Sequence, residues 1–69
     1  MRGAGGLAAD LKAVIEDRDE GDGAPVPAVI EEIADGEVYT KKDVRATLKH
    51  LNRVGEVYKP QDDRVRVTP

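Results

Sequence analysis

A predicted helix that runs directly into two alternating segments places the strongest constraint on the fold of this chain. Within residues 40–54, apolar side chains recur at intervals of three and four, which is the pattern of a helix with one buried face. Thr40 is a good N-cap, and Asp43 completes a capping box with it. Gly55 follows the last periodic residue and can take the left-handed conformation that ends many helices. The sequence therefore predicts a helix over 40–54 with a defined start and stop.

The residues after this helix have the pattern of a hairpin. Segments 56–59 and 64–68 alternate apolar and polar side chains, as half-buried strands do. The sequence Pro-Gln-Asp-Asp at 60–63 has the chemistry of a turn. A short hairpin is not stable alone in water, so we expect it to lie on the helices, with Arg64 and Arg66 directed to solvent.

Two further helices are expected upstream. Apolar residues recur at helical spacing within 7–18 and within 27–35, and Pro27 suits the first position of the second helix. Residues 24–26 surround a proline and are expected to be extended, so they could add a short edge strand to the hairpin. Residues 1–6 have nothing to pack and are expected to form a mobile tail.

These elements predict a single α+β domain over residues 7–69. Three helices followed by a C-terminal two-stranded hairpin have the order of a winged helix-turn-helix domain, in which the hairpin is the wing. The apolar stripe of the third helix places Leu48 and Leu51 in the centre of the expected core. We expect these leucines to contact Ile15 and Ile30 on the other two helices.

The charges of the chain are segregated between its two halves. Residues 37–69 hold eight Lys and Arg against five Asp and Glu, whereas residues 1–36 hold three against nine. On the predicted third helix, four cations fall within an arc of about 80° opposite the apolar stripe. These are Lys42, Arg45, Lys49 and Arg53. A basic helix beside a hairpin is typical of nucleic-acid binding, so these four, with Arg64 and Arg66, are the candidate DNA-binding residues. The alternative is an ordinary solvated face.

Length and composition argue against catalysis. Sixty-nine residues leave no room for an ATPase module or an enclosed substrate pocket. With no cysteine and one histidine, the chain has no disulfide and no thiolate metal site, and it carries no nucleotide-binding or nucleophile motif. We expect no enzyme activity, no cofactor and no metal. No apolar run is long enough for a membrane span or a signal peptide, so we expect a cytoplasmic, nucleoid-associated protein without a membrane partner.

Two segments of the sequence resemble a known family. Gly23-Ala24-Pro25-Val26 precedes the second helix, and Leu-Lys-His-Leu-Asn-Arg-Val-Gly-Glu-Val-Tyr-Lys-Pro at 48–60 leads into the hairpin. In this order and at this separation they are similar to the C-terminal winged-helix domain of archaeal MCM replicative helicases. The resemblance spans roughly residues 8–68. The chain departs from that family in its more basic third helix and its short connection at 35–38.

The resemblance implies a non-catalytic regulatory role. Such domains modulate the ATPase and unwinding activities of the helicase and contact DNA or partner proteins weakly. We therefore expect weak backbone contacts with DNA, contacts with the helicase ATPase domain or other replication proteins, and a monomer in isolation. Two alternatives remain open. One is a free-standing winged-helix transcription regulator, although such regulators usually dimerise and this chain has no spare apolar helix for a dimer interface. The other is a protein-docking module that uses Tyr58, Lys59 and the acidic first half without touching nucleic acid.

Overall fold

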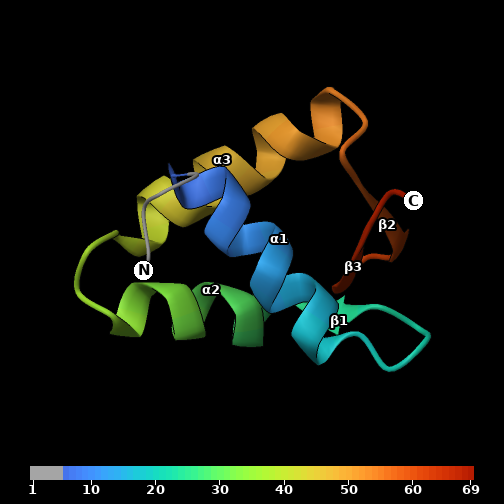
Figure 1. The fold of residues 1–69 in the computed structure, drawn as a ribbon, viewed down its shortest axis with the longest axis horizontal. Coiled ribbons are helices and arrows are strands. Elements are labelled where there is room, and N and C mark those ends of the chain that lie inside the picture. The colour runs from blue at the N-terminus through green and yellow to red at the C-terminus, as the bar shows by residue number, and fades with distance from the viewer. Residues whose placement is uncertain (1–5) are drawn as a thin grey trace.

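The computed structural model describes residues 6–69, which form three helices and a three-stranded antiparallel sheet (Figure 1). In chain order the elements are α1 (Gly6–Arg18), β1 (Ala24–Pro25), α2 (Val26–Asp35), α3 (Lys41–Arg53), β2 (Val57–Gln61) and β3 (Arg64–Val67). The predicted α+β arrangement of helices and C-terminal hairpin is present, and the short extra strand joins the same sheet. The tail expected at 1–6 lies outside the described residues except for Gly6, which begins α1.

Both ends of α3 form as predicted. The Thr40 hydroxyl accepts a hydrogen bond from the Asp43 N–H at 3.1 Å, and the Asp43 carboxylate accepts one from the Thr40 N–H at 3.4 Å. At the other end Gly55 has a φ of 83°, in the left-handed region that favours glycine. The next N–H, from Glu56, donates to the carbonyl of Leu51 at 2.9 Å, which completes a Schellman-type end. Local side chains therefore define where α3 begins and ends.

The entry into α2 differs from the prediction by one residue. The sequence pattern places Val26 in the edge strand and Pro27 first in the helix, but Val26 is the first residue of α2 and Pro27 the second. The Val26 N–H donates to the carbonyl of Asp63 at 2.9 Å. The hairpin turn thus supplies the partner that a first-turn N–H lacks within its own helix. Proline is tolerated beside it because it has no N–H to satisfy.

The hairpin turn is tighter than predicted. Strand β2 continues through Gln61, which pairs with Arg64, so the turn consists of residues 62–63 instead of 60–63. The register shifts between Tyr58 and Gln61, and Pro60 lies in this irregularity. Since β2 is an edge strand, a proline there removes no ladder hydrogen bond that the sheet needs. The predicted strand ends also move inward by one residue, to Val57 and Val67.

The core lies where the three helices meet the inner face of the sheet. Helix α1 packs against α2, α3 and β3, and in Figure 1 it passes in front of α3 and ends beside the sheet. The largest fully buried side chains are all aliphatic: Leu11, Ile15, Val29, Ile33, Val44, Val57 and Val65. Leu51 and Ile30 are also buried, as predicted. Leu48, however, is half-buried at the edge of the core. It lies on the side of the apolar stripe of α3 that borders the cationic face and the solvent.

We predict that Leu51→Ala lowers the free energy of unfolding by about 2–5 kcal/mol, because the change leaves a cavity under α3. Leu48→Ala should cost less, since that side chain already faces solvent on one side. The matched control is Val38→Ala, at a valine that is 67% exposed, which should change stability by no more than about 0.5 kcal/mol. Urea denaturation followed by circular dichroism measures all three. Equal losses for Leu48→Ala and Leu51→Ala would contradict the assigned core.

Candidate nucleic-acid interface

The outer face of α3 carries four exposed cations. Lys42, Arg45, Lys49 and Arg53 all lie on the solvent side of the helix. Within residues 6–69, none of the four forms an ion pair with an acidic side chain. The structure therefore brings together the four helix residues that the sequence pattern selects, and it leaves their charge available to an external anion.

The acidic side chains nearest to the ends of α3 are engaged elsewhere. Asp43 is held in the capping box at the helix start, where the helix dipole favours a negative charge. Glu56, just past the helix end, pairs with Lys12 of α1. Lys12 lowers the pKa of Glu56, first through its hydrogen bond and second through its charge. Within residues 6–69, neither carboxylate forms an ion pair with the four cations of α3.

Arg64 and Arg66 do not behave as predicted. The alternation of β3 directs them to solvent, but both are half-buried against the loop that joins α1 to β1. Arg66 Nε donates to Asp19 Oδ2 at 2.7 Å. Arg64 Nη1 donates to the carbonyl of Gly23 at 3.2 Å and lies 3.9 Å from Asp22 Oδ1. The hairpin arginines thus face acidic groups of the same chain, which the sequence places more than forty residues away.

Asp19 is the centre of this contact. Its Oδ1 accepts hydrogen bonds from the N–H groups of Gly21 at 2.8 Å and Gly23 at 2.9 Å, while Oδ2 accepts from Arg66. The bond from Gly21 and then the bond from Arg66 lower the pKa of the Asp19 carboxyl below its ordinary value. Gly23 has a φ of 99°, and a Cβ there would lie 3.1 Å from the Cβ of Arg64. Glycine is therefore required both for the loop conformation and for its close approach to β3.

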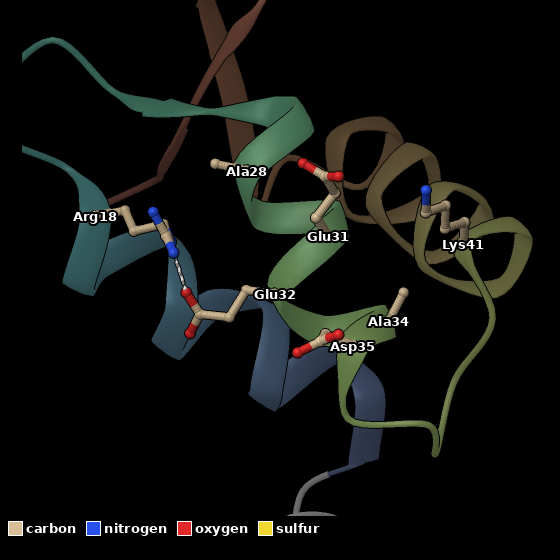
Figure 2. A pocket seen from close by; sticks show the side chains of 7 residues that line it. All are labelled: Arg18, Ala28, Glu31, Glu32, Ala34, Asp35 and Lys41. Carbon is tan, nitrogen blue, oxygen red and sulfur yellow. Dashed lines mark hydrogen bonds and ion pairs between the residues drawn. The ribbon is translucent and has the colours of Figure 1, made fainter.

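A second surface region is acidic and unsuited to phosphate. An open hollow of about 650 Å³ lies along α2. Figure 2 shows Glu31, Glu32 and Asp35 along this helix and Lys41 across from them. Arg18 Nε donates to Glu32 Oε1 at 2.6 Å and closes one side. The lining holds three carboxylates and two cations, so its net charge is negative and would repel a nucleic-acid backbone. This face is best understood as solvated surface.

Lys59 was predicted for the protein-docking alternative but not among the DNA-binding residues, and the structure places it beside two of them. Arg45, Lys49 and Lys59 border a groove of about 330 Å³ between α3 and the hairpin. The period-two pattern of a strand places Lys59 on the same side as the buried Val57, and that parity is the signal by which the sequence could have identified it.

Comparison with protein-family models, with curated proteins and with solved structures found no match. Among residues 6–69 there is no cluster of three or more His, Cys, Asp or Glu side chains placed to hold a metal ion. Nor does any helix in that range combine the length and the apolarity that a bilayer crossing requires.

We predict that Asp19→Asn lowers the melting temperature at neutral pH, because the amide replaces a charged acceptor of Arg66. The lowered pKa means that the carboxylate stabilises the fold above about pH 3.8, its ordinary pKa, and loses this effect as the pH falls through the folded-state value. The difference in melting temperature between parent and variant should therefore be largest near neutrality and shrink in acid. Asp17→Asn, at an exposed neighbouring carboxyl, is the control. A difference that does not change with pH would contradict the role assigned to Asp19.

Proposed function

We propose that this chain is a non-catalytic, DNA-contacting domain of winged-helix type, with α3 as the recognition helix and the β2–β3 hairpin as a short wing. The observation that carries the proposal is the outer face of α3, where four exposed cations lack an acidic partner within residues 6–69. A phosphate backbone is the polyanion that such a stripe fits best. The order of helices and strands agrees with this reading.

The contact should be weak and largely independent of sequence. Four helix cations neutralise few phosphates, and the chain has a net charge of −3. The turn of the wing carries Asp62 and Asp63, which would face the backbone unfavourably. Arg64 and Arg66 can bind phosphates only by giving up their contacts with Asp22 and Asp19. The contact of Arg66 with Asp19 is the shorter of the two, so Arg66 is the less available. We therefore expect a Kd on the order of 10⁻⁴–10⁻⁶ M.

For biological context, we propose that the domain is the C-terminal regulatory part of an archaeal MCM-type replicative helicase. The support is a pair of sequence motifs. One, at 23–26, leads into α2, and the other, at 48–60, runs from α3 into the wing. In that setting the ATPase would lie in another part of the same protein, and this domain would modulate it through weak contacts with DNA or with the ATPase module. Sequencing the gene upstream of residue 1 tests this context. An AAA+ ATPase module there would support it, whereas an unrelated neighbouring gene would favour a free-standing regulator.

We predict that replacing Lys49 and Arg53 together by alanine weakens binding to all duplex sequences alike. Two lost phosphate contacts should reduce the slope of log Kd against log salt concentration by roughly two. Fluorescence anisotropy with a labelled duplex at several salt concentrations measures the slope. The matched control is Ala9→Glu with Ala13→Glu, which lowers the net charge by the same two units at exposed positions of α1 and breaks no ion pair. If both double variants change the slope equally, net charge and not the face of α3 governs binding.

A second prediction locates the contact directly. Titrating duplex into the isotopically labelled domain at low salt should shift amide signals along the outer face of α3, because backbone phosphates approach its cations. The acidic surface of α2 should be unaffected, since it repels the same phosphates. Shifts confined to α1 and α2 would exclude the proposed orientation.

A further inference from the structure

The groove between α3 and the hairpin has an apolar floor. Its floor consists of Val26, Ile30, Leu48, Val57 and Val65, which come from α2, α3 and both hairpin strands. Val57 and Val65 are almost fully buried, whereas Val26 and Leu48 are half-buried. Side chains of the core thus also line an opening of about 330 Å³ at the surface.

The opening extends beyond this first hollow. A second hollow of about 410 Å³ shares Val26, Ile30 and Arg45 with it and continues past Pro27 toward the start of α3. The two hollows adjoin, because they share three lining residues, and we call them together the α3–hairpin groove. An apolar floor that runs over side chains of α2, α3 and the hairpin suits a chain segment that places side chains in it at regular intervals.

The rim of this groove is mainly cationic, and Glu31 is the one acidic side chain among the residues that line its two hollows. Arg45 and Lys49 lie along its α3 side, and Lys59 lies on the hairpin side. All three are exposed, and none forms an ion pair with a residue in the described part of the chain. The occupant that complements both features has apolar side chains for the floor and carboxylates for the rim.

Other occupants fit less well. Nucleic-acid bases bind single-strand sites by stacking on aromatic rings, and the floor is entirely aliphatic. A second copy of this chain offers Val38, Val54 and Tyr58 as its large exposed apolar side chains within residues 6–69. Val38 and Val54 lie beyond opposite ends of α3 and Tyr58 lies on β2, so the three do not form one row of apolar anchors on a helix. A helix with three apolar anchors supplies such a row.

We infer that the α3–hairpin groove is a docking site for an acidic amphipathic helix of a partner protein. Leucine-like side chains at i, i+4 and i+7 occupy the apolar floor, and flanking Asp or Glu side chains pair with Arg45, Lys49 and Lys59. This goes beyond the proposed contact with DNA, although the two surfaces share Arg45 and Lys49. It also differs from docking through the acidic half of the domain, which would require a basic partner.

The test uses a fluorescein-labelled acidic peptide with leucines at i, i+4 and i+7, and a control peptide of the same composition with the leucines scattered around the helix. Amide shifts in the labelled domain should map to the groove floor for the first peptide and be weak for the second. Lys59→Glu should weaken binding of the first peptide about tenfold, because it reverses a rim charge. Lys42→Glu, on α3 but outside the groove lining, should change it by no more than about twofold.

Leu48→Gln separates this inference from the proposed function. It makes the floor polar but keeps every cation, so peptide binding should fall while the salt slope for duplex DNA is retained. Amide dispersion checks that each variant is folded, and Val26→Thr provides a second floor variant should Leu48→Gln unfold. Equal binding of both peptides would overturn the inference in favour of non-specific charge attraction. Absence of groove shifts, or self-association abolished by Val38→Asp, would overturn it as well.

Discussion

The rotation of α3 about its own axis determines most of what this domain presents to its surroundings. Val44 and Leu51 are buried, and they fix which side of the helix faces the core. A rotation by one residue would carry Arg45 toward an aliphatic interior with no partner for its charge, which is far more costly than losing an apolar contact. The cationic face therefore follows from core packing. The groove follows from it too, because Leu48 lies at the edge of the same stripe.

Three acidic side chains complement this arrangement by pairing with cations that lie outside α3. Glu32 pairs with Arg18, Glu56 with Lys12, and Asp19 with Arg66. Exposed pairs of this kind add little stability. Their larger effect is on the distribution of charge, because they neutralise the cations of α1 and β3 and leave those of α3 unpaired within residues 6–69. The net negative charge of the chain is thus compatible with one positive face.

The parts of the structure that sequence reasoning identified are those with local causes. The ends of α3 depend on Thr40, Asp43 and Gly55, which act within a few residues of one another, and the cationic stripe depends only on helical periodicity. The wrong predictions depend on contacts across the fold. The alternation of β3 correctly places Arg66 on the opposite face of the strand from the inward valines. It contains no information about the loop between α1 and β1, whose Asp19 binds Arg66 on that opposite face. In the same way, periodicity assigns Leu48 to the apolar stripe but does not show how far the hairpin extends over it.

The order of strands has a consequence for how the domain is made. Strand β3 lies between β1 and β2 in the sheet, yet it is the last of the three to be synthesised. Until residues 64–67 leave the ribosome, β1 has no strand to pair with, β2 has none either, and Asp19 lacks its arginine. The three helices can form early, because their hydrogen bonds are local. The sheet therefore cannot assemble until β3 is available, and the apolar positions of β1 and β2 have no partner strand before β3 pairs with both neighbours.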